Sequence, residues 1–584
     1  MRVLLLHPED SPRHGPWSEQ RWDLIVDLGR SSPASAAAWG ELTHTPLLRA
    51  DSFRRGVEDL KQVRKLFSLG LGRLIDKEGI DWWDLTSLVI MPETEMVLVF
   101  QRMISEIDPA AEIWATQPGW PASVVSVLLK CPIQSFSQKP SERLNTRVMR
   151  YAHLFQRFSA QQIKEILIDK YDSGYEWRSR FASRTRPLSE PSILLPTAYG
   201  NVSRMAAAYA RLLPEQSFLL VATRQSGRLS NLPPNIRTRD LAGYFDNHSH
   251  TREDAVILEE WAKLKANLCA IPEFAVLSNA GVFNRFPRWF QDGLRARDAW
   301  RQVIRREPVC GVLCGDDSNF YTRLPVLLAA RRGIPTVDFH HGALDGRYLL
   351  KDLPCDAYLA KNEMECDYLL RICGLPPGRV IVGAPAFPEA DLPPNGDHLP
   401  STCLVFFSEP YESFGMRAEE LYREVLPPLC RIARESGRDV VLKLHPFESA
   451  SQRSSMVRDL LPEEDFKRIT VVDGPLSQEL LSRAWFGVTV ESTTVLDCSL
   501  RGVPCFVCAW VNLLPFGYVQ QYARFGIGHI LRDAHELSEI PNLLAGLRKS
   551  SPPSTNLWKT AEPEALRQLL GIRSRTGEVV RRTS

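Results

Sequence analysis

The sequence lacks long apolar runs and a strong excess of charge of either sign. No hydrophobic stretch approaches the roughly 18 to 20 residues that a membrane-spanning helix needs, and the apolar start at residues 1–7 is too short for a signal-peptide core. A net charge of +2 gives no whole-molecule argument for nucleic-acid binding. We therefore expect a cytoplasmic protein that binds no nucleic acid, with peripheral contact at the inner membrane as an open alternative.

Clustered cysteines and paired metal-ligand motifs are also missing. The 12 cysteines are scattered, and the one close pair, Cys505 and Cys508, lies in an apolar strand-like run without a second pair nearby. Buried thiols are the favoured interpretation and a metal or redox site the alternative. No carboxylate pair has the spacing of a dedicated metal site. The sequence therefore predicts chemistry without a metal.

The length of 584 residues exceeds what one core can hold, and it predicts about three to four domains. Alternating strand and helix patterns indicate α/β units throughout. In the first unit we expect strands at residues 2–6, 24–26, 88–91, 113–116 and 133–136, with helices over 52–75 and, after Pro92, 94–107. The expected domains are an N-terminal α/β domain (1–139), a basic helical connector (140–188), two Rossmann-like domains (189–390 and 391–550) and a tail (551–584).

The predicted connector is rich in arginine and lysine, with aromatic residues between them. A solvated helix packed between domains is the favoured interpretation. The alternative is a surface for a polyanionic acceptor or an anionic membrane.

Polar residues in the last predicted domain gather where strands give way to helices. The strand at residues 440–444 includes Lys443 and ends at His445 and Pro446, and the strand at 487–490 ends at Glu491, Ser492, Thr493 and Thr494. In a parallel sheet both strand ends face one crevice. A helix that opens with Ser492 offers hydroxyl and N–H donors to an anion, so the pattern predicts a phosphate site.

A similar arrangement is predicted in the preceding domain. A buried strand at residues 309–314 ends at Asp316 and Asp317, and the strand at 335–339 ends at His340, His341 and Gly342. His341 can act as a general base, because an imidazole titrates near neutral pH. Either aspartate can instead be the base or orient the histidine.

Taken together, these motifs resemble the GT-B glycosyltransferase superfamily, over residues 190–545. The closer likeness is to bacterial capsule and teichoic-acid polymer enzymes: CDP-glycerol glycerophosphotransferases and the CMP-sugar sialyl- and Kdo-transferases. The resemblance implies a GT-B-like pair of Rossmann-type domains facing a cleft, in addition to the N-terminal α/β domain. It also implies that His445 and the cluster from Ser492 to Thr494 hold the nucleotide phosphate, and that His341 lies across the cleft as the base.

The resemblance further implies a substrate class. The donor would be a nucleotide-activated sugar or glycerol, with CMP or CDP favoured over UDP, and no other cofactor. The acceptor would be a saccharide or a lipid-linked saccharide, and a polysaccharide-assembly complex is a further possible partner. The residues after Gly342 depart from the glycerophosphotransferase pattern, and Asp317 is followed by Ser318 where many sialyltransferases have glycine.

Simpler interpretations exist for each candidate residue. His445 can merely cap a turn, and Ser492 can merely cap a helix. Glu491 can contact a ribose hydroxyl or begin the helix. At the level of function, the alternatives are a non-hydrolysing nucleotide-sugar 2-epimerase and a non-catalytic nucleotide-binding scaffold for polysaccharide assembly.

Overall fold

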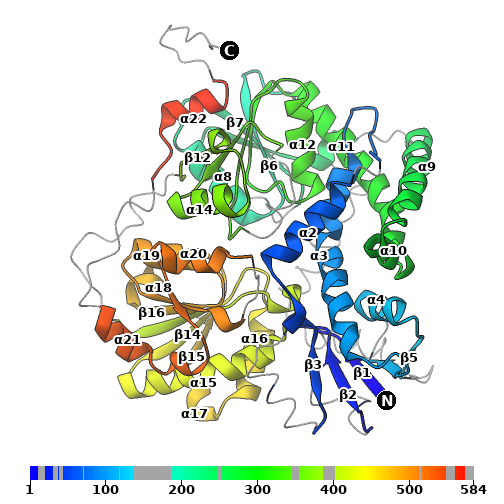
Figure 1. Cartoon of the computed structure of the whole chain (residues 1–584). Coiled ribbons are helices and arrows are strands. Elements are labelled where there is room, and N and C mark those ends of the chain that lie inside the picture. Colours follow the sequence, from blue (N-terminus) through cyan, green and yellow to red (C-terminus); the bar gives the residue numbers. More distant parts are fainter. Residues whose placement is uncertain are drawn as a thin grey trace.

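A computed structural model shows a chain built around three separate parallel sheets (Figure 1). The structure describes residues 1–8, 20–30, 44–69, 72–116, 119–136, 186–224, 231–245, 251–344, 354–385, 401–511, 516–547 and 559–572, with the single positions 10, 17, 37, 227 and 229. All but the last three residues of the predicted basic connector lie outside these ranges.

The N-terminal sheet has five parallel strands in the order β3-β2-β1-β4-β5. They are β1 (Arg2–Leu6), β2 (Leu24–Asp27), β3 (Leu47–Arg49), β4 (Glu112–Ala115) and β5 (Ile133–Ser135). The short strand β3 was not predicted. Within the helical range expected at 52–75, the structure has α2 (Val57–Phe67), and α4 (Trp120–Leu129) connects the last two strands.

The predicted strand at residues 88–91 is wrong, because this segment belongs to α3 (Trp82–Met103), which continues through Pro92. Proline removes one backbone donor from a helix and usually ends or kinks it. Pro92 lacks the N–H that would donate to the carbonyl of Leu88, and two residues further on the hydroxyl of Thr94 donates to the carbonyl of Ile90 at 2.8 Å. α3 is buried on most sides, and its apolar run therefore lacks the helical period that would have identified it.

The second sheet has seven parallel strands in the order β12-β11-β10-β9-β6-β7-β8. Its strands are β6 (Ser192–Thr197), β7 (Ser217–Ala222), β8 (Ile236–Asp240), β9 (Val309–Cys314), β10 (Thr336–Phe339), β11 (Ala357–Ala360) and β12 (Val380–Val382). Its helices include α8 (Gly200–Ala210), α9 (Thr251–Leu268), α10 (Pro272–Asn279), α11 (Phe286–Arg306), α12 (Phe320–Ala330) and α14 (Glu363–Asp367). We call this unit the first half of the cleft.

The third sheet has six parallel strands in the order β15-β14-β13-β16-β17-β18. They are β13 (Cys403–Phe407), β14 (Asp439–Lys443), β15 (Ile469–Val472), β16 (Ala484–Thr489), β17 (Cys505–Cys508) and β18 (His529–Leu531). The accompanying helices are α15 (Ala418–Ser436), α16 (Ala450–Leu460), α17 (Glu463–Phe466), α18 (Gln478–Arg483), α19 (Thr494–Leu500), α20 (Tyr518–Arg524) and α21 (Ile540–Leu547). We call this unit the second half. The structure thus has two Rossmann-type units and an N-terminal α/β unit, which confirms the predicted fold class.

The C-terminal segment returns to the first half, although we expected a tail there (Figure 1). Thr560 pairs with Ala384 in a parallel bridge, and α22 (Pro563–Leu569) follows directly. Leu566 and Leu570 are buried in the same hydrophobic cluster as strands β6 and β7. The apolar side chains of this short helix therefore complete the core of the first half.

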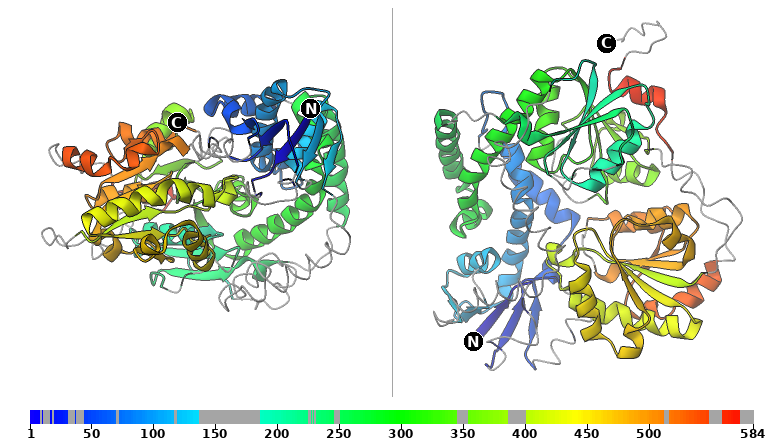
Figure 2. Two further views of the ribbon diagram at one scale, coloured as in Figure 1. Left: turned by 90° about the horizontal axis from the view of Figure 1, so that it is seen from below. Right: turned by 180° about the vertical axis from the view of Figure 1, so that it is seen from behind.

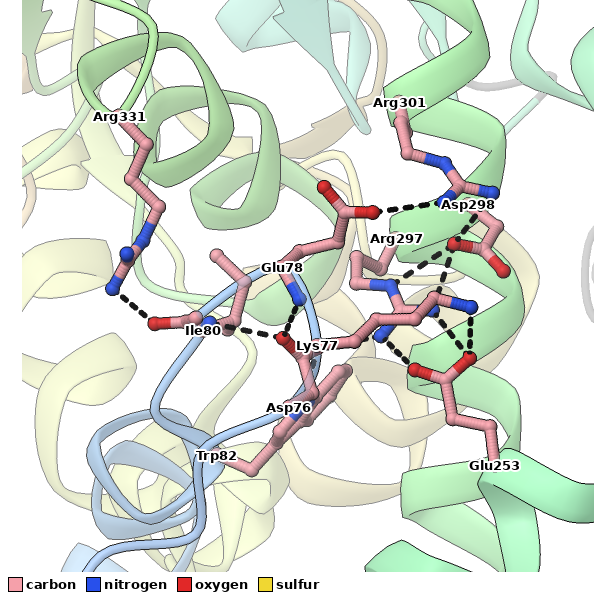
Figure 3. Close-up of polar contacts among 11 residues, drawn as sticks. Asp76, Lys77, Glu78, Ile80, Trp82, Glu253, Arg297, Asp298, Arg301 and Arg331 are labelled. Carbon is pink, nitrogen blue, oxygen red and sulfur yellow. Dashed lines mark hydrogen bonds and ion pairs between the residues drawn. The ribbon is translucent and has the colours of Figure 1, made fainter.

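The N-terminal unit is anchored to the first half through Arg297 of α11 (Figure 3). The fully buried guanidinium of Arg297 contacts Asp76 at 2.7 Å, Glu253 at 2.5 Å and Asp298 at 2.8 Å. Asp76 belongs to the loop that leads into α3, and it also accepts a hydrogen bond from the indole of Trp82 at 2.9 Å. The loop and the two long helices α9 and α11 are thus joined at one charged node.

A second anchor connects the N-terminal unit to the second half. Arg417, directly before α15, donates to the carboxylate of Asp27 at 3.0 and 3.2 Å. It also donates to the carbonyls of His7 and Asp10. His7 and Asp10 follow β1 and Asp27 is the last residue of β2, so Arg417 lies at the carboxyl edge of the N-terminal sheet. The N-terminal unit therefore touches both halves, as the back view also shows (Figure 2).

The two close cysteines of the sequence lie in the core of the second half. Cys505 and Cys508 are buried in β17, where they pack as small apolar side chains. None of the helices in the described ranges combines the length and apolar character that crossing a bilayer requires.

Candidate functional site

The candidate site lies where the strand order of two sheets reverses. In the first half the order reverses between β6 and β9, and in the second half between β13 and β16. Loops at such switch points leave a crevice at the carboxyl ends of the strands, where open α/β sheets bind ligands. A cavity of about 1250 Å³ is lined by both pairs of loops. It is large enough for a nucleotide-linked sugar.

Nearly all of the predicted site residues line this one cavity. The first half contributes Asp316 and His341, and the second half contributes Lys443, His445, Pro446, Glu491, Ser492, Thr493 and Thr494. Asp317 is the exception. It is fully buried, and its carboxylate accepts a hydrogen bond from Arg323 at 2.7 Å. The structure therefore gives Asp317 a place in the core and not in the cavity.

His445 is held as a neutral imidazole by its own loop. The backbone N–H of Phe447 donates to Nδ1 of His445 at 3.2 Å, which leaves Nε2 as the protonated nitrogen. Burial, together with the charges of Lys443 and His341, lowers the pKa of His445 to about 4. At neutral pH His445 is thus a hydrogen-bond donor without a charge.

The loop that carries His445 is fixed by Glu448. One carboxylate oxygen of Glu448 accepts from the backbone N–H of His445 at 2.8 Å, and the other accepts from Ser408 and Arg453, each at 2.8 Å. Arg453 in turn binds Glu412 through two hydrogen bonds of 2.6 and 2.7 Å. The simple interpretation of His445 as part of a capped turn is therefore correct as far as its backbone is concerned. Its side chain still lines the cavity.

The ammonium group of Lys443 forms hydrogen bonds with backbone carbonyls of the protein. It donates to the carbonyls of Leu444 at 2.8 Å and Gly474 at 2.6 Å. Burial lowers the pKa of Lys443. Its main contribution is therefore to hold two loops of the cavity wall, with one N–H still available.

The hydroxyl cluster after β16 differs from the prediction in its local structure. The helix begins at Thr494 and not at Ser492, and α19 has seven residues. The N-cap residue is Thr493, and the N–H of Thr494 donates to the Ser492 hydroxyl at 3.3 Å. The Ser492 hydroxyl keeps its own proton for a ligand. Among the described residues the Thr494 hydroxyl oxygen has no hydrogen-bond partner. A short helix adds little electrostatic field, so the hydroxyl groups themselves matter most here.

Glu409 is a site residue that the sequence analysis missed. It follows β13 at the switch point of the second half, lines the cavity and is almost fully buried. Its carboxylate accepts from the backbone N–H of Glu491 at 2.7 Å and from the Thr489 hydroxyl at 3.3 Å. Burial raises the pKa of Glu409 to about 7. Only the topology brings it beside Glu491, because 82 residues separate the two in the chain.

Asp316 and His341 lie on the opposite wall. The Asp316 carboxylate already accepts hydrogen bonds from the backbone N–H of Ser318 at 3.0 Å and from the Asn319 amide at 3.3 Å. These bonds occupy it within its own turn. His341 sits in a loop beyond β10, and its charge reaches His445 across the cavity. Of the candidates for the base, His341 is the one that acts on the pKa of His445 in the second half.

Two further groups from the first half approach the second half. Tyr199, in the loop after β6, packs edge-on against Phe447 with ring centroids 5.8 Å apart. Arg204 of α8 lines the cavity, and its charge acts on Lys443. Arg211, two turns further along, also lines the cavity. No pattern in the sequence pointed to these residues, since an arginine on a helix surface is ordinary.

Acidic residues are more numerous in the cavity than the sequence suggested. Glu409, Glu491 and Asp497 all line the second-half wall. Burial raises the pKa of Asp497 to about 6. In the described ranges no three histidine, cysteine or acidic side chains come together in the manner of metal ligands.

Comparisons with known proteins give no match by sequence and several matches by structure. No family model and no curated protein sequence matches the chain. A putative UDP-N-acetylglucosamine 2-epimerase from Listeria monocytogenes is similar in structure, with 14% identity, coverage of 67% of this chain and 100% of that chain, and a TM-score of 0.41. A UDP-GlcNAc 2-epimerase from Neisseria meningitidis, bound to UDP-GlcNAc, has 12% identity, coverage of 66% and 98%, and a TM-score of 0.38. MurG from Acinetobacter baumannii has 12% identity, coverage of 65% and 99%, and a TM-score of 0.35.

Proposed function

We propose that this chain is a glycosyltransferase, or a glycerophosphotransferase, that moves a group from a nucleotide-activated donor to a hydroxyl of a surface-polysaccharide acceptor. The observation that carries the proposal is the single cavity that both switch points share. It places a candidate base, His341, opposite a cluster of neutral hydrogen-bond donors formed by His445, Ser492 and Thr494. Group transfer needs these two functions on opposite sides of the reacting bond.

In the glycosyl version of the reaction, the acceptor oxygen bonds to the anomeric carbon of the donor. The bond between that carbon and the phosphate oxygen breaks, and the electron pair leaves with the nucleotide. The proton of the acceptor hydroxyl passes to His341. Nε2–H of His445 and the hydroxyl groups of Ser492 and Thr494 donate to the phosphate as its charge grows. Preorganised donors of this kind stabilise a transition state by about 3 to 4 kcal/mol each.

A nucleotide screen tests the donor side. In a thermal-shift assay against CMP, CDP, UDP and GDP, we expect CMP or CDP to stabilise the protein most. Thr494→Val removes the hydroxyl oxygen and keeps the shape, so it should weaken nucleotide binding and leave the unfolding temperature of the free protein nearly unchanged. Thr470→Val, on the exposed side of β15, is the matched control. Equal nucleotide binding by Thr494→Val and wild type would argue against the phosphate site.

A transfer assay tests the chemistry. With a CMP- or CDP-activated donor and a saccharide acceptor, His341→Ala should lose turnover and keep nucleotide binding, whereas His445→Ala should weaken both. A wild-type protein that binds nucleotide and transfers nothing to any acceptor would instead support the non-catalytic scaffold.

A second candidate function is the epimerisation of a nucleotide-linked amino sugar at C2. The acidic residues Glu409 and Asp497 favour it, because removal and return of a carbon-bound proton needs groups that titrate near neutral pH. Incubation with UDP-N-acetylglucosamine in the absence of any acceptor separates the two reactions. Formation of the 2-epimer would establish the epimerase, and its absence together with transfer would establish the transferase.

A further inference from the structure

We propose that Lys361 is a positioning residue that fixes the loop of His341. The inference rests on the proposed function in one respect only, namely that His341 is the base. Lys361 follows β11, the strand beside β10, and is buried. It does not line the cavity itself, so any effect on the reaction must pass through the residues that it holds.

The ammonium group of Lys361 has three N–H donors, and it makes two hydrogen bonds and one ion pair. It donates to the carbonyl of His340 at 2.9 Å and to the carbonyl of Gly342 at 3.0 Å. It also pairs with the carboxylate of Glu365 at 2.8 Å. The two carbonyls belong to the residues immediately before and after His341. One buried cation therefore binds a backbone carbonyl on each side of the candidate base.

The cation is itself held firmly in place. Glu365 lies in α14, is fully buried and accepts a further hydrogen bond from the hydroxyl of Tyr358 at 3.0 Å. Asn362 caps the same helix by accepting from the N–H of Glu365 at 2.8 Å. The loop of His341 is thus tied through Lys361 to a strand and a helix of the first half.

Stability alone is a weak explanation for this arrangement. Burying a lysine and a glutamate costs several kcal/mol of desolvation for each ion, and apolar residues of similar volume commonly stabilise a core at least as well. The described residues that directly follow β10, 340–344, belong to no strand or helix. A general base must stay within about 3 Å of the proton that it takes, so a rigid loop is a functional requirement.

A buried lysine makes a similar contact in the second half. Lys443 is buried and donates to the carbonyl of Leu444, the residue before His445, and to the carbonyl of Gly474. In both halves, then, a buried lysine holds the carbonyl that precedes a cavity histidine. The two lysines come from different positions in their sheets, since Lys443 ends β14 and Lys361 follows β11. The shared feature is therefore the contact and not a repeated sequence.

The test compares Lys361→Met with Glu365→Gln. Lys361→Met removes both carbonyl contacts and should lower kcat about 100-fold, the size expected for a displacement of about 1 Å in a reacting group. Nucleotide affinity, measured by calorimetry with CMP and CDP, should stay unchanged, because the phosphate donors lie in the other half. Glu365→Gln keeps an acceptor for Lys361 and leaves both carbonyl contacts intact, so its kcat should stay within about threefold of wild type. A folded Lys361→Met protein with wild-type kcat would overturn the proposal.

A spectroscopic readout keeps the proposal testable without activity. In wild type, the carbon-13 resonance of the His341 imidazole should be single and narrow, and in Lys361→Met it should shift or split while that of His445 stays in place. Should Lys361→Met not fold, Lys361→Gln keeps two N–H donors on a shorter side chain, and an unchanged His341 resonance in that variant would refute the role. If wild type transfers nothing, the proposed function fails and this resonance still decides the role of Lys361.

Discussion

The backbone N–H of Glu491 donates a 2.7 Å hydrogen bond to the side chain of Glu409. This contact joins the ends of β13 and β16 at the switch point of the second half. It fixes the start of the hydroxyl loop that carries Ser492 and Thr494. A buried carboxylate is therefore part of the cavity wall that we assign to the nucleotide phosphate.

Glu409→Gln should make the free energy of unfolding less sensitive to rising pH. The pKa of Glu409 is raised to about 7, so the folded state binds a proton more tightly than the unfolded state. Stability is therefore lost as pH rises from about 4.5 to 7, and the loss is on the order of 3 kcal/mol. Glutamine keeps a carbonyl acceptor without the charge. Chemical unfolding at pH 5 and pH 8 measures the effect. The free energy of unfolding of Glu409→Gln, taken relative to that of wild type, should be higher at pH 8 than at pH 5.

The control for this measurement is Glu463→Gln, an exposed glutamate of α17. Its unfolding should follow wild type at both pH values, because an exposed i,i+4 pair contributes only tenths of a kcal/mol. A pH dependence of Glu409→Gln identical to that of wild type would show that Glu409 does not titrate in this range.

His445 should remain neutral across the physiological range. Burial and the charges of Lys443 and His341 lower its pKa to about 4, so the folded state binds fewer protons than the unfolded state between about pH 4 and 6.5. Its contribution to stability is complete above that window and is lost as pH falls through it. Histidine-selective NMR should show no titration of His445 between about pH 5.5 and 8.

Two changes should raise the pKa of His445. His341→Ala removes a like charge from across the cavity, and a bound nucleotide phosphate adds an opposite one. The His445 resonance should therefore titrate at a higher pH in the variant, and higher again with CMP or CDP present. An unchanged pKa of His445 in the His341→Ala variant would mean that the two rings do not face the same cavity.

Much of the fold could be predicted because parallel sheets repeat a simple pattern. The apolar runs of β6, β9, β13 and β16 are buried on both faces, and each ends in a polar loop. The segment at residues 88–91 was misassigned for the same reason, since an apolar run buried inside α3 has the composition of a central strand. The return of α22 to the first half could not be predicted, because its few apolar residues give no indication of which core they join.

The candidate site was predictable only in part. His341, His445 and Ser492 stand at strand ends, and the order of strands along the chain was enough to bring them to one crevice. Glu409 also stands at a strand end, but its partner is distant in sequence and Glu-Pro has no distinctive pattern. Arg204 and Lys361 depend on three-dimensional proximity alone. Asp317 differs from Asp316 by one position, and the turn directs it into the core, to Arg323.

Arg417→Met should detach the N-terminal sheet from the second half. The substitution keeps the aliphatic length and leaves the buried carboxylate of Asp27 without its guanidinium. Breaking a buried pair on one side costs about 3 to 5 kcal/mol. The double variant with Asp27→Asn should recover part of this loss, and the difference between the single and double variants measures the coupling.

Urea unfolding is the appropriate measurement for this anchor, with Arg423→Met as the control. Arg423 lies on α15, which Arg417 precedes, and its pair with Glu419 is only partly buried, so its loss should cost less than about 1 kcal/mol. If Arg417→Met unfolds like the control, the contacts with His7, Asp10 and Asp27 do not hold the two units together.

Arg297→Met should destabilise the anchor to the first half, and by an amount that depends on pH. The variant leaves Asp76, Glu253 and Asp298 without the guanidinium that joins them, and a buried uncompensated charge costs about 3 to 5 kcal/mol. Burial alone would raise the pKa of Glu253, but the hydrogen bonds from Arg297 and Lys77 lower it to about 2. The stability that this carboxylate contributes is present above its unfolded pKa of about 4.5 and is lost as pH falls toward 2.

The stability difference between wild type and Arg297→Met should therefore be largest near neutral pH and shrink as pH falls below about 4.5. Urea unfolding at pH 7 and pH 3 measures both values. Arg288→Met, an exposed position on the same helix, is the control and should change little at either pH. A stability difference between the two proteins that stays constant from pH 7 to pH 3 would mean that Arg297 acts through packing and not through its carboxylate partners. The N-terminal unit would then be held to the first half mainly by its apolar contacts.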